Sequence, residues 1–471
     1  MELLTDQKIQ LEQYLTSGCD ERIYLNKDGL TKYWIDPLDY RNMVHRGSCT
    51  CGTLNPETEA LMEHLIHQDL DKTEKYEALL DEQTDTLKSL INYEGLDEFE
   101  VFYAPSGSDL VYFPISFCQI LHPERPMLNI LSCPEELGSG TLHAVKGEYH
   151  ANFNQFEEPI KKGAKVHPDF NIKVVSLTAR SDNGKIINHE AYIKEQINQH
   201  PDHSIIVSLV YGSKSGIEDN LDIINKIDRE DIIWTIDMCQ FRHSREFIHN
   251  LLSKNGCVMI TGSKFYQAPP FCGSLLINQK LMDKLKAGDL TQFSKLKTVL
   301  SAYDFPKSIR HQVNIPFKKN IGLRLRWACS LDEIKKFKQI PKEQVRAKIK
   351  AWNTFINKKM NASDIFELMP DQSMTNNTII SFRVKKNGQF LDHETLKELH
   401  RLVVCEGDKE GLGNQKVFIG QPVAYGEKSF LRVAIGSMNI RAFVEHDETE
   451  FEEDNRILSI IKLKLNSIEE N

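Results

Sequence analysis

The chain has 471 residues, of which 40% are hydrophobic and 27% are charged, and its formal net charge at pH 7 is −9. This composition is typical of a folded globular protein with two or three domains, and it excludes collagen-like, disordered and disulfide-stapled chains. Because the net charge is negative, there is no basic field to attract nucleic acid or anionic lipid. We therefore predict neither a nucleic-acid partner nor a membrane partner.

The hydropathy pattern indicates a cytoplasmic protein. The longest apolar run, residues 205–211, is far shorter than the roughly 20 residues that a membrane-spanning helix needs. The first residues lack the basic stretch and apolar core of a secretion signal. The ten cysteines are scattered along the chain, which is typical of reduced, buried thiols.

Residues 1–55 are predicted to form an N-terminal arm. Its aromatic stretch from Tyr33 onward either covers a pocket or a neighbouring subunit, or docks on the surface. His45, Cys49 and Cys51 lie close together, but no second Cys or His pair follows at the spacing of a zinc site. We therefore predict an ordinary loop here and no metal.

A large α/β domain is predicted for residues 56–315. Residues 57–91 carry apolar side chains at helical spacing. Short apolar runs then alternate with amphipathic stretches, and these runs are predicted to be buried strands: 100–103, 127–131, 173–177, 205–209, 232–236 and 258–260. Strands that alternate with helices predict a mostly parallel, mixed sheet with helices on both faces.

A smaller C-terminal α+β domain is predicted for residues 316–471. Residues 331–357 have the pattern of one long connecting helix, and the later apolar runs have the spacing of strands: 377–382, 415–419 and 430–435. The acidic stretch 445–454 is predicted to be a solvated face before a last helix.

Polar residues that follow the predicted strands are candidates for chemistry, because ligands of open α/β sheets bind at the carboxyl ends of strands. Gly107 and Ser108 begin a helix directly after a strand, so their amides either bind a phosphate or form an ordinary N-cap turn. Asp237 ends another strand, where a carboxylate needs a cation or several donors. It is either a site residue or a cap.

A lysine and an arginine complete the pattern. Lys264 stands in a Thr-Gly-Ser-Lys turn after the next strand, and it is either a solvated loop residue or a desolvated amine able to act as a nucleophile. Arg432 interrupts an apolar strand, where its guanidinium either binds a carboxylate or forms a salt bridge at a strand edge.

The series of phosphate turn, aspartate, lysine and late arginine resembles fold-type I pyridoxal-phosphate-dependent enzymes. It is most similar to the group of class V aminotransferases and cysteine desulfurases. The residues that carry the resemblance are the turn at Gly107, the Asp-x-x-Gln run from Asp237, the turn at Lys264 and the strand around Arg432. The resemblance extends over roughly residues 55–440.

The resemblance implies pyridoxal 5'-phosphate as cofactor and a role for each matching residue. Lys264 would hold the cofactor as a Schiff base and move the substrate proton, while Asp237 would keep the pyridine nitrogen protonated. Arg432, helped by Gln421, would bind the substrate. The other implied cofactor-binding residues are Gly107, Ser108, Gln240, Thr261, Ser263 and His143.

The chain departs from the family pattern at several positions. Ser263 replaces a histidine before the lysine, the loop after Lys264 lacks the usual glycines, and Ser213 stands near the place of an asparagine. The residue that covers the ring is either His143 or a member of the pair Glu135 and Glu136.

The predicted reaction is transamination of an α-amino acid, because it needs the lysine, the aspartate and a carboxylate clamp. The alternatives are a lyase or desulfurase, and a non-catalytic scaffold that keeps the fold. A desulfurase would need a nucleophilic cysteine, for which Cys405 is the candidate, although it equally fits a buried structural thiol. The resemblance also implies a homodimer.

Overall fold

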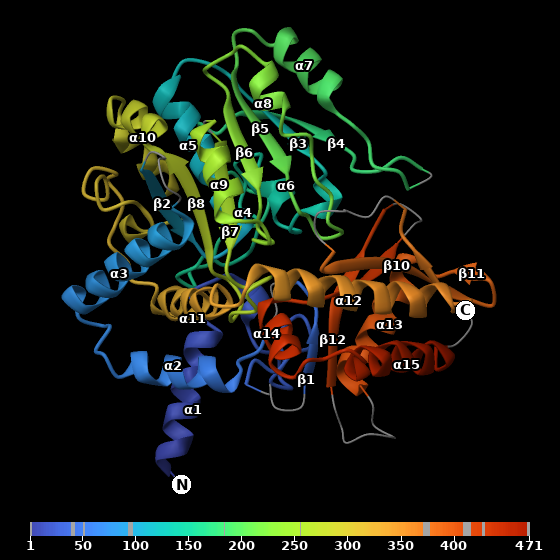
Figure 1. The fold of residues 1–471 in the computed structure, drawn as a ribbon. Coiled ribbons are helices and arrows are strands. Elements are labelled where there is room, and N and C mark those ends of the chain that lie inside the picture. The colour runs from blue at the N-terminus through green and yellow to red at the C-terminus, as the bar shows by residue number, and fades with distance from the viewer. Residues whose placement is uncertain are drawn as a thin grey trace.

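Two sheets organise the chain in the computed structural model, which describes residues 2–38, 43–49, 52–92, 98–182, 184–254, 256–370, 377–407, 416–425 and 429–468. The larger sheet occupies the upper half of Figure 1 and the smaller sheet its lower right. The strands of the larger sheet are β2 (Phe99–Ala104), β3 (Met127–Ser132), β4 (Ile172–Leu177), β5 (Ser204–Val210), β6 (Ile233–Asp237), β7 (Gly256–Thr261) and β8 (Gly273–Asn278).

The larger sheet is mixed and mostly parallel, as predicted. Its strand order is β2-β8-β7-β6-β5-β3-β4, and β8 runs in the direction opposite to the other six strands. β4 lies at one edge, so most of its residues are partly or fully exposed, and the prediction that it is a buried strand was wrong. The parallel neighbours β5, β6 and β7 bring their carboxyl ends to one place.

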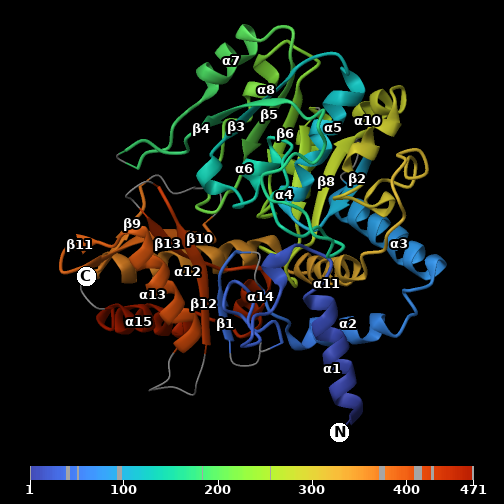
Figure 2. The same ribbon diagram turned by 180° about the vertical axis from the view of Figure 1, so that it is seen from behind.

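Helices cover both faces of the larger sheet, which is why its strands are apolar on both sides. In β5, Ile205 and Val207 belong to one core cluster, and Ile206 and Val210 belong to the cluster on the other face. α5 (Tyr112–Leu121) and α10 (Gln279–Lys286) pack on one face, while α9 (Arg245–Ser253) and α3 (Thr73–Ile91) pack on the other. Figure 2 shows both layers from behind.

The smaller sheet takes a strand from the N-terminal segment. Its path is β1-β12-β13-β10-β11, with β9 paired to β10, and β1 runs parallel to β12. Its strands are β1 (Met43–Arg46), β9 (Phe366–Leu368), β10 (Ile379–Lys386), β11 (Gln389–Phe390), β12 (Lys416–Val423) and β13 (Phe430–Ala434). Its helices are α12 (Lys342–Asn361), α13 (His393–Glu406), α14 (Ser437–Glu445) and α15 (Glu452–Asn466).

Two helical stretches that the sequence pattern treats as continuous are broken. Residues 57–91 form α2 (Pro56–Ile66) and α3, separated by a turn in which Asp69 has a left-handed φ of 54°. Residues 331–357 belong to α11 (Ile321–Phe337) and α12. The chain breaks at Pro341 because proline lacks an N–H donor and disfavours helix in the residue before it.

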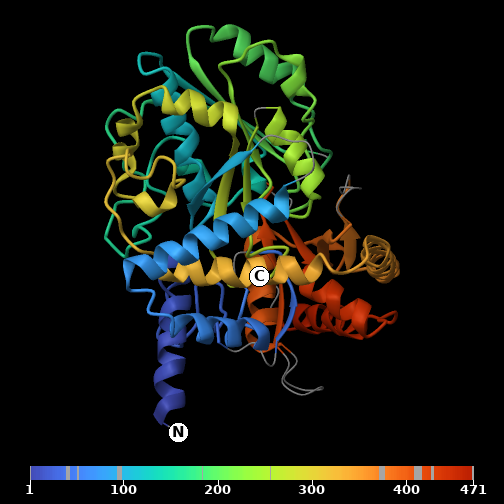
Figure 3. The same ribbon diagram turned by 60° about the vertical axis from the view of Figure 1, so that its left-hand side comes forward.

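The remaining helices are short, except α1 and α7 (Glu190–Gln199). α1 (Glu2–Leu15) extends away from the rest of the chain towards the N-terminus, as Figure 3 shows. The short helices are η1 (Glu21–Ile23), α4 (Gly107–Leu110), η2 (Pro134–Glu136), α6 (Thr141–Ala144), α8 (Ile223–Lys226), η3 (Leu290–Leu296) and η4 (Ala302–Asp304). None of the helices in the described ranges is long and apolar enough to span a membrane. The domain limits 1–55, 56–315 and 316–471 stay predictions.

Candidate active site between the two sheets

A cavity of about 590 Å³ lies where the carboxyl ends of β5, β6 and β7 approach the smaller sheet. Its walls come from three parts of the chain: the ends of the larger sheet, the strands β12 and β13, and the N-terminal segment. Asp237, Gln240, Lys264, Gln421 and Arg432 all line it. The structure thus brings together five of the residues that were singled out from the sequence.

Lys264 follows β7 in a tight turn whose shape depends on a glycine. A Cβ atom on Gly262 would lie 1.9 Å from Ser330 Oγ of α11, so only glycine fits this close approach. Thr261 Oγ1 donates to the Cys239 carbonyl at 2.7 Å, which ties the turn to the segment after β6. The turn therefore holds the half-buried Lys264 side chain at the cavity.

Asp237 is the last residue of β6 and lies opposite Met259 of β7, two positions before the turn begins. Its Oδ1 accepts a hydrogen bond from the Cys239 amide at 2.9 Å. Asp237 and Lys264 line the same cavity, and within the described ranges no ion pair joins them. The two charges thus face a shared space from neighbouring strands.

The predicted phosphate turn lies beside the segment that follows Asp237. Ser106 caps α4 and forms a capping box with Asp109, so Gly107 and Ser108 are the first two residues of this helix. A Cβ atom on Gly107 would lie 2.9 Å from Cys239 Sγ, and Ser108 Oγ is 3.2 Å from Thr141 Oγ1. Hence Gly107 and Ser108 lie next to the ends of β6 and β7, although they do not line the cavity.

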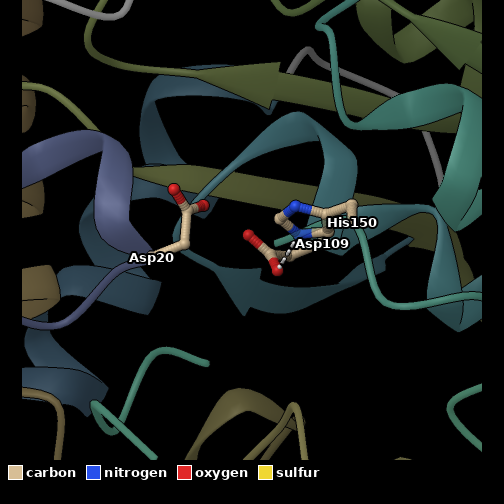
Figure 4. Close-up of side chains that lie close together, drawn as sticks. All are labelled: Asp20, Asp109 and His150. Carbon is tan, nitrogen blue, oxygen red and sulfur yellow. Dashed lines mark hydrogen bonds and ion pairs between the residues drawn. The ribbon is translucent and has the colours of Figure 1, made fainter. Parts of the chain in front are cut away.

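Asp20, Asp109 and His150 form a polar group next to the capping residue Ser106. His150 Nε2 and Asp109 Oδ1 are 2.8 Å apart, and Figure 4 shows them facing each other with Asp20 alongside. The three could form a metal-ligand set by distance. However, Arg22 donates to both carboxylate oxygens of Asp20, and Ser106 donates to Asp109 Oδ2. We assign this group a structural role, because both carboxylates already have donors.

Gln240 and Ser263 are both buried beside the cavity. Gln240 pairs with Ser48 of the N-terminal segment: the Ser48 hydroxyl donates to Oε1, and Nε2 donates to the Ser48 carbonyl at 3.3 Å. Ser263 Oγ is buried and makes no hydrogen bond to oxygen or nitrogen in the part of the chain described. The Ser263 hydroxyl could therefore donate to a ligand, whereas the Gln240 amide is already hydrogen-bonded to Ser48.

Arg432 is 3% exposed and comes from the middle of β13. It lies opposite Gly420 of β12, where a Cβ atom would be 2.7 Å from its Nε, so the glycine makes room for the side chain. Nη2 donates to Cys49 Sγ at 3.1 Å, and Nη1 donates to the Lys214 carbonyl at 3.2 Å. The nearby Gln421 is half-buried at the cavity wall.

His143 lies apart from the cavity, whereas Glu136 lines it. His143 belongs to the short helix α6 and pairs with Glu148 at 2.8 Å. Glu136 accepts hydrogen bonds from Ser213, Ser215 and Tyr425, so it joins the turn after β5 to the smaller sheet. Of the alternatives for the residue over the ring, His143, Glu135 and Glu136, only Glu136 is among the cavity-lining residues.

Several other residues that line the cavity were not predicted from the sequence to bind the cofactor or the substrate. Ser48 and Cys49 follow β1, and Lys214 follows β5 in the turn where only Ser213 was noted. Tyr33 and Trp34 also line the cavity, as one alternative for the N-terminal segment predicted. Cys405 does not line it, and most of the loop after Cys405, like Cys51, lies outside the described residues.

The cavity is electrostatically positive at one end. Burial, followed by the charges of Arg432 and Lys264, lowers the pKa of Lys214 to about 8. Burial and the charge of Arg432 lower the pKa of Arg242, which lies behind Arg432, to about 9. Burial is the main cause of both shifts and repulsion between the cations adds to it, so a bound anion would stabilise both charges.

Solved structures of enzymes share this fold. The phosphoserine aminotransferase SerC from Cytophaga hutchinsonii superposes with a TM-score of 0.52 at 14% identity, over 86% of this chain and 98% of that one. The glutamate decarboxylase domain of a diaminobutyrate-pyruvate transaminase and L-2,4-diaminobutyrate decarboxylase from Vibrio parahaemolyticus gives 0.55 at 14% identity, over 91% and 82%. A NifS-like protein from Rickettsia africae gives 0.52 at 10% identity, over 87% and 99%.

These likenesses show the fold, which is that of the fold-type I pyridoxal-phosphate-dependent enzymes, and they confirm the predicted resemblance at that level. No protein-family model matches the chain, and no curated protein matches its sequence. The aminotransferases and the decarboxylase among the similar structures catalyse different reactions, so the fold leaves the reaction open.

Proposed function

We propose that this protein is a pyridoxal-phosphate-dependent enzyme that acts on an α-amino acid, and that its reaction is transamination. The observation that carries the proposal is the position of Lys264 and Asp237. They stand at the ends of the neighbouring strands β7 and β6 and line one cavity with Arg432. An amine, a carboxylate and a guanidinium at such a place match the groups that this chemistry needs.

The residues around the cavity fit the cofactor. A phosphate would bind the amides of Gly107 and Ser108 together with the Ser263 hydroxyl, which is buried without a hydrogen bond to oxygen or nitrogen in the described chain. The Thr261 hydroxyl would join them if it exchanged its bond with the Cys239 carbonyl. Asp237 has a second carboxylate oxygen for the pyridine nitrogen, because Oδ1 already accepts from Cys239. Gln240 would hold the ring hydroxyl if it exchanged its bond with Ser48.

The bound cofactor would supply an electron sink for the carbanion formed at the substrate α-carbon. Lys264 would attach the cofactor covalently and then, as a free amine, carry the proton from the α-carbon. Asp237 would keep the ring nitrogen charged, and Arg432 would fix the substrate carboxylate with two parallel hydrogen bonds. The aromatic side chains Tyr33 and Trp34 at the cavity would limit the access of water.

A lyase or desulfurase reaction is the second candidate, and Cys49 favours it. Its thiol lines the cavity and accepts a hydrogen bond from Arg432 at 3.1 Å. A cation beside a thiol stabilises the thiolate, which is the nucleophilic form. Cys405, by contrast, is a half-buried thiol at the end of α13, and burial raises its pKa.

Reduction with borohydride tests the proposal directly. We expect the purified chain with added pyridoxal phosphate to absorb visible light, and after reduction to carry one phosphopyridoxyl group on Lys264, identified by peptide mass spectrometry. Lys264→Ala should lose the label, the colour and the activity, whereas Lys286→Ala, an exposed lysine of α10, should keep all three. A chain that binds no cofactor would leave the scaffold as the explanation.

Product analysis separates the two reactions. A transaminase forms a keto acid and leaves the cofactor as pyridoxamine phosphate, whereas a lyase releases ammonia or a sulfur species. Cys49→Ser should leave transamination within about threefold and should abolish sulfur release if the thiol is the acceptor.

We also propose that the enzyme is a homodimer in the cytoplasm, as the sequence resemblance and the hydropathy pattern predict. Light scattering during size-exclusion chromatography measures the mass of the assembly and so tests the dimer.

A further inference from the structure

The cavity is basic although the chain as a whole carries a net charge of −9. Six basic residues line it, against two acidic residues. The basic residues are Arg22, Lys32, Lys214, Lys264, Lys397 and Arg432, and the acidic residues are Glu136 and Asp237. A basic cavity in an acidic chain concentrates anions from solution. Its ligands are therefore expected to be negatively charged.

Some of these cations are neutralised by residues of the chain itself. Arg22 donates to both carboxylate oxygens of Asp20, at 2.7 Å and 2.5 Å. Lys397 pairs with Glu394 at 2.7 Å on the exposed side of α13. These two side chains need no ligand. Of the four that remain, Lys32 is exposed and Lys264 is the proposed cofactor lysine, which leaves the charges of Arg432 and Lys214.

Arg432, Lys214 and the adjacent Arg242 have no carboxylate partner in the described ranges. Arg432 donates to a thiol and a carbonyl, and its Nε has no partner. Arg242 donates to hydroxyls and to the Ile435 carbonyl at 2.9 Å. The Lys214 amine donates to the Glu135 carbonyl at 3.2 Å. Arg432 is buried, and Lys214 and Arg242 are half-buried. Cations withdrawn from water with only neutral partners are unfavourable, so bound anions would stabilise them.

Glu136 is the anion nearest to Lys214, and its charge raises the Lys214 pKa, but within the described ranges no ion pair joins the two side chains. Both of its oxygens accept hydrogen bonds, from Ser213, Ser215 and Tyr425. Burial alone would raise the pKa of Glu136, yet these hydrogen bonds hold it below its usual value. Glu136 is therefore a satisfied structural anion of the cavity wall.

Arg432 and Lys214 offer two separate points for an anion. The guanidinium of Arg432 meets the main-chain carbonyl of Lys214, whereas the Lys214 amine reaches the carbonyl of Glu135 in η2. One carboxylate bound to the Arg432 fork would therefore leave the amine free for a second acid group.

We infer that the site is specific for an amino acid with a second anionic group on its side chain, whose α-carboxylate binds Arg432 and whose second anion binds Lys214. This inference rests on the proposed function, because it places the amino acid beside Lys264. A carboxylate, a sulfinate and a phosphate share the required chemistry, since each accepts hydrogen bonds with a negative charge. An amino acid with a neutral side chain would leave the half-buried Lys214 amine without an ion-pair partner.

Binding to the cofactor-free chain tests the anion subsite independently of catalysis. Isothermal titration compares glutarate with butyrate, which lacks the second carboxylate. We expect glutarate to bind at least about tenfold more tightly, since a buried charge pair contributes more than about 1.4 kcal/mol. Lys214→Met should remove this preference. Lys397→Met, a lysine of the same cavity that Glu394 already neutralises, should keep it.

Turnover by the loaded enzyme distinguishes the acid groups. Glutamate, aspartate, cysteine sulfinate and O-phosphoserine are compared with alanine and glutamine, and we expect kcat/KM to favour at least one acid by about 100-fold. Lys214→Met should raise KM for that acid and leave alanine unchanged. Equal glutarate and butyrate binding, or an equal effect of Lys214→Met on acids and alanine, overturns the inference. If Lys264 takes no cofactor while glutarate still binds preferentially, the proposed function fails and the anion subsite stands.

Discussion

Two buried arginines in the smaller sheet differ in the charge that surrounds them. Arg46 of β1 and Arg432 of β13 are 2% and 3% exposed, and both strands pair with β12. Arg46 forms hydrogen bonds of 2.9 Å with both carboxylate oxygens of Asp454 and with Glu453. Arg432 donates to a thiol and a carbonyl. Arg46 therefore forms ion pairs with acidic side chains, whereas Arg432 forms none within the described ranges.

The comparison separates a structural charge from a functional one. Burial of a guanidinium is costly, and the fold compensates it at Arg46 with carboxylates from α15. At Arg432 no carboxylate of the described chain compensates the cost of burial, and the side chain lines the cavity. Both arginines are buried strand residues, so burial and position do not distinguish them. The absence of an acidic partner at a cavity is the feature that indicates a ligand site.

The largest effect is expected from Arg46→Met. It leaves Asp454 buried with the Trp352 indole as a remaining donor, so the free energy of unfolding should fall by about 3–5 kcal/mol. Urea unfolding followed by circular dichroism measures this loss. The double variant Arg46→Met with Asp454→Asn removes both charges and should recover part of it. If the double variant is no more stable than the single one, the carboxylate is not what makes Arg46 necessary.

Arg432→Met should give the opposite pattern. Because no buried acid is left unpaired, we expect the free energy of unfolding to change by less than about 1 kcal/mol. The value of kcat/KM for an amino acid should fall by about 100-fold or more, since the substrate carboxylate loses its charged partner. Steady-state kinetics and urea unfolding of one preparation give both numbers. A loss of stability as large as that of Arg46→Met would make Arg432 a structural residue.

The sequence was sufficient for the parts of the fold that depend on local pattern. Every strand predicted in the larger sheet is present, because buried parallel strands are short apolar runs. The pattern failed where one residue breaks a helix, as at Pro341, and where exposure depends on sheet order, as in the edge strand β4. It also gave no sign that residues 43–46 pair with β12, because such a contact joins positions far apart in the chain.

The candidate site was predictable only where residues follow strands. Asp237 and Lys264 stand directly after apolar runs, so the rule that ligands bind at strand ends selects them. Cys49 and Lys214 had no such signal of their own, because their place at the cavity depends on the packing of the N-terminal segment and the turn after β5. His143 resembled a ring-covering residue by position, but it lies beside Glu148 instead.

Asp304 is the acidic counterpart of Arg432, because it is buried without an ion pair in the described chain. Burial raises the pKa of Asp304 to about 7, against hydrogen bonds from Ser301 and Gln155. The folded state thus keeps a proton that the unfolded state releases near pH 4, so stability falls as the pH rises towards 7. Between about pH 5.5 and pH 7 we expect a loss of about 2 kcal/mol, at about 1.4 kcal/mol per pH unit.

Asp304→Asn provides the control for this pH dependence. The amide stays neutral at every pH, so the difference in unfolding free energy between the wild type and Asp304→Asn should shrink by about 2 kcal/mol over the same pH interval. Urea unfolding at several pH values measures this difference. A difference that does not change with pH would mean that Asp304 is already ionised in the folded protein at low pH.

The last prediction concerns Tyr425→Phe, because the Tyr425 phenol contacts Glu136 of the cavity wall. The phenol donates to the buried Glu136 carboxylate, and loss of a hydrogen bond to a charged group should reduce the free energy of unfolding by about 1.5–3 kcal/mol. Tyr149→Phe is the matched control, since that phenol donates to the neutral Thr298 hydroxyl at 3.1 Å and its loss should cost about 0.5–1.5 kcal/mol. Equal losses would mean that Glu136 does not carry its charge, and Lys214 would then lose the nearby anion that keeps its pKa from falling further. The affinity of Tyr425→Phe for glutarate should match that of the wild type, because Tyr425 contacts Glu136 and not the Lys214 amine.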